Sequence, residues 1–303
     1  MNSLVALDWG TSSLRAAHLD AQGQVLEERT SADGILNVAP GQFATVFIAT
    51  CGRWLRTTDT FCLISGMAGS RQGWMEAPYC PCPAGFDDIA RSLAWLPALP
   101  GPAGDVRIAF VPGLSCEHDG VPDVMRGEEV QVFGALRIAG LADATVVLPG
   151  THSKWVTVRG QRIERFRTFM TGEFFALLRQ HSILSRTMAA EDGPLDLPAF
   201  DQGVDRALNG TSLLATAFSA RTLALFGKMS ATALPSYLSG LVIGEELRSQ
   251  AAPGDTVLVV GVPALTQRYA RALERCGMKA HCMGPQATWQ GLHAVARQLE
   301  DAP

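Results

Sequence analysis

The sequence predicts an α/β protein of two domains, because one succession of elements, a β-meander followed by alternating helices and strands, occurs twice. In the first copy, an apolar run at residues 4–9 leads into Gly10-Thr11-Ser12-Ser13 and then into an alternating run. In the second, residues 146–148 lead into Gly150-Thr151-His152-Ser153 and again into an alternating run. Each half of the chain therefore carries a strand–glycine turn–strand hairpin.

The first half reads as a meander followed by α/β units. Alternating or continuous apolar runs predict strands at residues 4–9, 14–20, 24–28, 61–65 and 106–111. Apolar residues at helical spacing predict helices over 43–55 and 130–141. Residues 96–104 are rich in proline and glycine and are expected to form a surface loop. The helix expected over 130–141 leads into the second copy, so we place the domain boundary near residues 142–144, giving domains 1–142 and 143–303.

The second half repeats the meander and is richer in helices. Strands are expected at residues 146–148, 154–158, 161–169, 256–260 and 278–283. Helices are expected at residues 172–185, 204–226, 234–250, 265–276 and 288–299. Gly277 follows the fourth of these helices at the position where glycine commonly ends a helix.

Composition excludes several classes of protein. The 303 residues are 47% hydrophobic and 18% charged, which suits a globular chain rather than a disordered one. The net charge of −4 gives no basic face for nucleic acid, so we expect no nucleic-acid partner. No apolar run reaches the roughly 18 residues of a membrane span, and Asp8 interrupts the first apolar stretch, so we expect a cytoplasmic protein with reduced cysteines and no membrane partner.

The two glycine turns are candidate phosphate sites. Glycine lets backbone N–H groups crowd around an anion, and threonine and serine hydroxyls add donors. Gly10, Thr11 and Ser12 are the candidates in the first turn, and Gly150, Thr151 and Ser153 in the second. Asp8 is a candidate magnesium ligand beside the phosphates, with a strand-end cap as the alternative. Neither a Gly-x-x-x-x-Gly-Lys-[ST] loop nor a Gly-x-Gly-x-x-Gly fingerprint occurs, so the pattern indicates a different kind of ATP-using enzyme.

The element order resembles the actin/hexokinase/Hsp70 type of phosphotransferase, in which two ribonuclease-H-like domains close on a nucleotide in the cleft between them. Four segments are similar to the 2-dehydro-3-deoxygalactonokinase family: 111–115, 122–129, 148–155 and 170–173. The resemblance implies ATP-dependent phosphorylation of the 6-hydroxyl of 2-dehydro-3-deoxy-D-galactonate, with Mg²⁺. It also places Gly261 under the adenine or ribose, although the residue alone is a generic turn between a strand and a helix.

The resemblance further implies an acceptor site. Carbohydrate kinases of this fold carry an Asp before the second phosphate hairpin that accepts the proton of the attacking hydroxyl, and here Glu128 takes that place. Glu129 and Asp123 are alternatives, and first-turn acids are also favoured by the helix dipole alone. Arg71 and Lys154 are candidate ligands of the sugar acid. Residues 116–119 combine Cys, Glu, His and Asp, but we expect a solvated loop there rather than a metal site.

Other functions remain open from the sequence. A kinase of the same fold could act on another sugar or sugar acid, a phosphatase-like hydrolase would use water as acceptor, and a scaffold or chaperone ATPase would need further segments. The expected partners are a small sugar acid and ATP, and a homo-oligomer is possible.

Overall fold

The computed structural model describes residues 3–55, 60–101, 104–191, 193–250, 254 and 256–300, without the side chain of residue 300. The chain forms two compact units. Unit 1 comprises residues 1–144, 156–166 and 285–303, and unit 2 comprises residues 145–155 and 167–284. The chain first passes from one unit to the other between Ala144 and Thr145, and its last helix returns to unit 1. The boundary at 142/143 itself stays a prediction.

Unit 1 is built on a seven-stranded sheet with the order β3-β2-β1-β4-β8-β6, in which β7 also pairs with β8. The meander strands β1, β2 and β3 pair antiparallel, and β1, β4 and β8 run parallel. Their bounds are β1 Ser3–Trp9, β2 Leu14–Asp20, β3 Val25–Ser31, β4 Thr60–Ser65, β6 Ala94–Trp95, β7 Leu99–Gly101 and β8 Gly104–Phe110. The loop expected at 96–104 is thus partly wrong, because β7 pairs antiparallel with β8; residues 102 and 103 lie outside the described residues.

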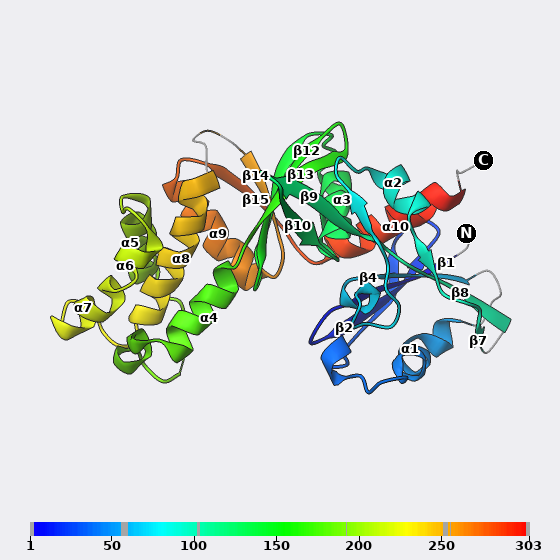
Figure 1. Ribbon diagram of the computed structural model, residues 1–303, viewed down its shortest axis with the longest axis horizontal. Helices are drawn as coiled ribbons and strands as arrows, with labels where there is room; N and C mark the ends of the chain where they lie inside the picture. Colours follow the sequence, from blue (N-terminus) through cyan, green and yellow to red (C-terminus); the bar gives the residue numbers. More distant parts are fainter. Residues whose placement is uncertain are drawn as a thin grey trace. The chain divides into compact units, whose positions relative to one another are not determined.

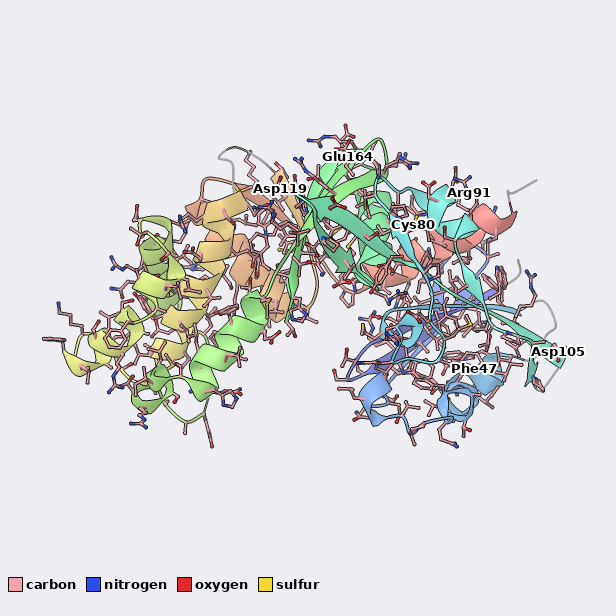
Figure 2. The ribbon with its side chains drawn as sticks, in the orientation of Figure 1. Phe47, Cys80, Arg91, Asp105, Asp119 and Glu164 are labelled. Carbon is pink, nitrogen blue, oxygen red and sulfur yellow. The ribbon has the colours of Figure 1, made fainter. Side chains whose placement is uncertain are left out.

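An aromatic cluster fills one face of this sheet. Trp74 contacts Trp9, Phe43, Phe47 and Phe110, with ring centroids 5.7 to 6.4 Å apart. Two of these rings come from α1 (Phe43–Cys51), and Figure 2 labels Phe47 on that helix. The helix expected over 43–55 ends early, at Cys51, and continues as a 3₁₀ turn, Gly52–Trp54.

A small second sheet in unit 1 was missed by the sequence reasoning. It has the order β10-β9-β5, with β5 Tyr79–Pro81, β9 Gly113–His118 and β10 Val121–Met125, and α2 (Phe86–Arg91) follows β5 along the chain. Residues 116–118 therefore belong to a strand rather than a loop, and Asp119, labelled in Figure 2, lies in the β9–β10 turn. The strands are too short and too irregular in polarity to show a clear alternation.

Two helices from distant parts of the sequence pack together in unit 1. They are α3 (Glu128–Ala139) and α10 (Gln286–Glu300), both predicted within a few residues of their observed bounds. Glycines face each other across the contact: a Cβ at Gly134 would overlap Ala287 O, and one at Gly291 would overlap Val130 O. The backbones therefore touch, and the end of the chain supports the helix on which Glu128 lies.

The five-stranded sheet repeats the order of the first, as β13-β12-β11-β14-β15. Its members are β11 Ala144–Leu148, β12 Ser153–Arg159, β13 Arg162–Phe169, β14 Thr256–Val260 and β15 Lys279–Met283, and β11, β14 and β15 run parallel. A meander is again followed by two parallel strands, which confirms the doubled plan predicted from the two hairpins. The division between the units falls within β12 and β13.

The helices of unit 2 are coloured from green to orange in Figure 1. They are α4 Thr171–His181, α5 Leu197–Leu208, α6 Leu213–Thr216, α7 Ser219–Leu225, α8 Leu234–Gln250 and α9 Pro263–Arg275, with a 3₁₀ turn at Ile183–Thr187. The single helix expected over 204–226 is wrong: α5 ends before Asn209-Gly210, and two short helices follow. Among the described residues, no helix is long and apolar enough to cross a membrane.

Candidate active site

The first glycine turn closes the β1–β2 hairpin of unit 1. Gly10 N–H donates to Ser13 O at 2.9 Å, and the side chains of Thr11 and Ser12 are exposed. The segment at residues 34–36 holds this turn, because Ile35 N–H donates to Gly10 O (3.0 Å) and Leu36 N–H to Thr11 O (3.2 Å). These backbone hydrogen bonds fix the turn, while its Thr11 and Ser12 hydroxyls remain exposed to a ligand.

Asp8 lies near the end of β1, beside the first glycine turn. In the sheet it pairs with Arg15 of β2 on one side and with Ser65 of β4 on the other. Its Oδ2 lies 3.8 Å from Arg15 Nε, and its side chain is 21% exposed. Burial raises the pKa of Asp8, and the Arg15 charge partly offsets that effect. A partly buried carboxylate of this kind gains most from an added positive charge.

Two glycines bring the ends of β1 and β4 against the start of α3. Gly66, directly after β4, has a φ of +89°, and a Cβ there would lie 2.9 Å from Trp9 O and 3.4 Å from Asp8 Oδ1. Gly127, directly before α3, has a φ of +103°, and its Cβ would lie 3.2 Å from Gly66 Cα. Side chains other than glycine rarely adopt these φ values, and they would keep the three segments apart.

Two acidic residues open α3, and their environments differ. Glu128 is half-buried, and its Oε2 accepts the Arg126 N–H at 3.0 Å. Glu129 is fully buried, and its Oε2 accepts the Gly127 N–H at 2.7 Å. Burial, together with the neighbouring Glu128 charge, raises the pKa of Glu129 to about 8, against the lowering effect of two backbone hydrogen bonds and Arg126. Asp123 lies on β10, and its Oδ1 accepts the Val124 N–H at 2.8 Å.

Arginines of two kinds lie in the same region of unit 1. Arg71 is exposed and follows the turn at Met67–Gly69. Arg126 is half-buried: its Nη2 donates to Ala77 O at 2.8 Å, and its guanidinium lies 4.5 Å from the centre of the Tyr79 ring. Arg71 was chosen from the sequence because it follows a strand end where related kinases carry an arginine, and Arg126 was noted only as part of the family segment 122–129.

The second glycine turn closes the β11–β12 hairpin in unit 2. Gly150 is half-buried and Thr151 is exposed. The start of α4 packs directly on this turn, because a Cβ at Gly172 would lie 2.5 Å from Gly150 O and the Glu173 N–H donates to Thr151 O at 3.0 Å. His152 Nε2 also lies 2.6 Å from Glu173 Oε2. Sequence reasoning grouped residues 170–173 only as a family segment, and the structure shows their contact with the turn.

A buried carboxylate on α8, Glu246, holds the strand that follows the second turn. Its Oε1 accepts the Ser153 hydroxyl at 2.8 Å and the Trp155 Nε1–H at 2.7 Å. Its Oε2 accepts the Tyr269 hydroxyl at 2.7 Å and also the Thr171 hydroxyl. Burial raises the pKa of Glu246, and these four donors oppose the shift. Ser153 is completely buried, so its hydroxyl already serves this network.

The other predicted residues of unit 2 lie near the same turn. Lys154 is 5% exposed, and its Nζ donates to Thr168 Oγ1 at 2.7 Å. Gly261 follows β14, with a φ of +156°, and a Cβ there would lie 3.8 Å from Pro149 O. A cavity of about 60 Å³ lies beside Gly150, with Phe175, Leu265, Arg268 and Tyr269 among its lining residues.

The structure thus brings together Asp8, the first turn and the start of α3 in unit 1, and the second turn, Gly261 and Glu246 in unit 2. Sequence reasoning missed Glu246 and Arg126, because nothing in the local pattern distinguishes a buried Glu or Arg from a surface one. Among the described residues, no group of three or more His, Cys, Asp or Glu is arranged to hold a metal ion.

Comparison with known proteins gives a consistent result along the whole chain. The profile of the family described as 2-keto-3-deoxy-galactonokinase matches residues 8–295. The chain is 38% identical to a probable 2-dehydro-3-deoxygalactonokinase of Rhizobium meliloti (strain 1021), covering 97% of this chain and 96% of that protein. It is 34% identical to the 2-dehydro-3-deoxygalactonokinase of Escherichia coli (strain K12), covering 97% and 98%.

Comparison with solved structures gives the same result. A crystal structure of a candidate 2-dehydro-3-deoxygalactonokinase from Sinorhizobium meliloti matches with a TM-score of 0.89 and 36% identity, over 98% of this chain and 99% of that one. The activator of 2-hydroxyisocaproyl-CoA dehydratase from Clostridium difficile, solved with bound ADPNP, matches with a TM-score of 0.51 and 13% identity, over 99% and 96%. The latter supports the fold alone.

The doubled sheet and its glycine hairpins place the chain in the actin/hexokinase/Hsp70-like fold class, as predicted. Within that class, the chain belongs to the 2-keto-3-deoxy-galactonokinase family. It is a kinase, and the resemblance seen in the sequence is confirmed.

Proposed function

We propose that this protein transfers the γ-phosphoryl group of ATP to the 6-hydroxyl of 2-dehydro-3-deoxy-D-galactonate. The observation that carries the proposal is the family match over residues 8–295, which includes both glycine hairpins and the acidic start of α3. In the transfer, the acceptor oxygen forms a bond to the γ-phosphorus, the bond to the β–γ bridging oxygen breaks, and ADP leaves.

We propose that unit 1 handles the acceptor and the metal. The exposed hydroxyls of Thr11 and Ser12, with the N–H groups of the turn at Gly10, are the proposed donors to phosphate oxygens. Asp8 fits a magnesium ion, which proteins commonly hold through one or two carboxylates, with water and substrate phosphates completing the shell. Bound there, the ion would neutralise charge on the phosphates. A single half-buried carboxylate suits this mode of binding.

Glu128 is the proposed proton acceptor. It opens α3 where Gly127 meets Gly66, and it is less buried than Glu129. Because burial favours the protonated form of Glu129, Glu128 is the better base at neutral pH. Arg71 and Lys154 stay candidates for binding the sugar acid.

In unit 2, Gly150 and Thr151 are proposed to bind phosphate, and Gly261 to lie under the adenosine. The cavity beside Gly150 supports this assignment, because its apolar lining and Arg268 suit part of a nucleotide. Ser153 acts through Glu246, by fixing the strand after the turn.

The test is an ADP-coupled assay with four acceptors: 2-dehydro-3-deoxygalactonate, its gluconate epimer, a neutral hexose and water alone. We expect turnover with the galactonate derivative well above the other three. Preference for the epimer or the hexose would indicate another kinase of this fold, and ADP release that no acceptor increases would indicate a hydrolase.

A further inference from the structure

Among the described residues of unit 1, several buried polar atoms lack a hydrogen-bond partner. Arg15 Nε, Thr288 Oγ1 and His293 Nδ1 lie on β2 and α10, whereas four others lie near one turn: Ser70 Oγ, Arg126 Nε, Arg126 Nη1 and Glu129 Oε1. Ser70 follows the Met67–Gly69 turn, and a Cβ at Gly69 would lie 3.2 Å from Arg126 Nη1. Gly127, which connects Arg126 to α3, lies against Gly66 at the start of the same turn.

Unpaired buried polar atoms of this kind are costly. Leaving a buried polar group without a partner costs about 1–3 kcal/mol, and more for a charged group. Proteins retain such groups where a ligand supplies the missing partner or where a function requires them. A cluster beside Asp8 and the acidic start of α3 therefore indicates a polar ligand rather than a packing accident.

The Arg126 guanidinium is held in a fixed orientation. One nitrogen donates to Ala77 O at 2.8 Å, and the guanidinium carbon lies 4.5 Å from the centre of the Tyr79 ring. A guanidinium placed in this way has lost most of its side-chain freedom before any ligand arrives. Its Nε–H and an Nη1–H remain as donors for an anion with oxygen acceptors.

Arg126 satisfies the requirements of a carboxylate site better than the residues chosen from the sequence. Arg71 is exposed to water, where a charged contact contributes little. Lys154 already donates to Thr168 Oγ1 at 2.7 Å. A charge-assisted hydrogen bond is stronger in a buried setting, and arginine suits carboxylates in particular.

We propose that Arg126 determines specificity for an acidic acceptor by binding its carboxylate through Nε–H and Nη1–H. The inference rests on the proposed function for the identity of the acceptor. It assigns the acceptor's charged end to Arg126, beside the turn at residues 66–70, and gives the family's preference for a sugar acid a physical origin in one pre-oriented side chain.

The test compares two acceptors, 2-dehydro-3-deoxygalactonate and its uncharged C1 amide, in the wild type, Arg126→Lys, Arg126→Gln and the control Arg91→Gln, an exposed arginine on α2. For the acid, we expect kcat/KM to fall about 10- to 150-fold in Arg126→Gln, the range expected for losing charge-assisted hydrogen bonds. For Arg126→Lys, we expect a kcat/KM for the acid between the values of the wild type and Arg126→Gln. The amide should be turned over equally by the wild type and both Arg126 variants, and the KM for ATP should change less than about twofold. Arg91→Gln should behave as the wild type.

The outcomes separate three cases. Equal losses for acid and amide in the Arg126 variants would mean a purely structural role and would overturn the inference, as would an unchanged preference for the acid. If Arg126→Gln does not fold, the ratio of kcat/KM for the acid to kcat/KM for the amide is compared between Arg126→Lys and the wild type. A lower ratio in Arg126→Lys supports the inference, and an unchanged ratio overturns it. A wild type that phosphorylates neither acceptor would refute the proposed function itself.

Discussion

At the scale of single residues, Asp8 occupies a position where added positive charge is favourable. Burial raises its pKa, and Arg15 at 3.8 Å offsets this only in part. We expect Asp8→Asn to keep the fold and to lower kcat at least about 100-fold, because the carboxylate no longer holds the metal beside the phosphates. Steady-state kinetics at saturating Mg²⁺ measure this. The control is Asp105→Asn, an exposed aspartate on β8 labelled in Figure 2. Wild-type turnover of Asp8→Asn would remove Asp8 from the mechanism.

The acids around the start of α3 are tested as a set. Glu128→Gln keeps the shape of the side chain but cannot accept a proton, so we expect kcat to fall about 10²- to 10⁴-fold with ATP affinity nearly unchanged. Glu129→Gln and Asp123→Asn are the matched variants, and we expect smaller losses in both. A dominant loss in either of them would move the base to that residue. Normal turnover in all three would leave positioning and electrostatics as the source of the rate.

Glu129 also makes a pH prediction for stability. Because burial raises its pKa from 4.5 to about 8, the folded protein binds a proton that the unfolded chain has released across this range. The free energy of unfolding therefore falls as the pH rises from about 4.5 to about 8. In Glu129→Gln, the free energy of unfolding should depend less on pH over this range. Its gain in stability relative to the wild type should be largest near pH 8. Urea unfolding at several pH values measures it, and an unchanged slope in the variant would contradict the assignment.

At the scale of elements, close helix packing depends on glycine. In unit 2, α5 and α8 approach so closely that a Cβ at Gly240 would overlap Phe200 O, and one at Gly203 would overlap Tyr237 O. We expect Gly240→Ala to lower stability by about 1–3 kcal/mol or more, because the helices must separate. Denaturant unfolding measures this, with Gly193→Ala as the control, since nothing lies within 4 Å of the Cβ position there. Equal stability of the two variants would show that the contact relaxes freely.

At the scale of the whole molecule, the chain forms two units with separate cores, and the first is completed by its last helix. Arg15 illustrates this: its Nη2 donates to Pro285 O at 3.4 Å, and its guanidinium lies 4.9 Å from the Trp289 ring centre. His293 Nε2 also lies 3.1 Å from Ala21 O. The β1–β2 hairpin, which carries Asp8 and the first turn, is thus supported by residues about 270 positions away in sequence.

This arrangement predicts a regional response to mutation. Gly291→Ala, at the α3–α10 contact, should increase amide hydrogen exchange in β1 and β2 more than in β14 and β15. Gly240→Ala should show the opposite pattern, because its contact lies in unit 2. Exchange measured by mass spectrometry on the full chain compares the two. A uniform increase in both variants would mean that the units unfold as one.

The sequence by itself determined the doubled plan of the molecule. Alternation and helical spacing are local properties, so the two meanders, α8 and β14 were predicted at or near their observed bounds. The two glycine turns were found for the same reason, since a Gly-Thr-x-Ser turn is visible without knowing what surrounds it. The predicted roles of Asp8, Glu128 and the turn residues remain to be tested by the experiments above.

Only the tertiary structure decided which polar side chains are buried and what they contact. Ser153 donates to a glutamate 93 positions away, Arg126 donates to Ala77 O from 49 positions away, and Glu129 is fully buried at the start of α3. The cost of burying a charge, and the gain from pairing it, depend on neighbours that the fold brings from distant positions. The short strands β5, β9 and β10 could not be predicted from the sequence for a similar reason, because pairing with one another, rather than their own residue pattern, stabilises them.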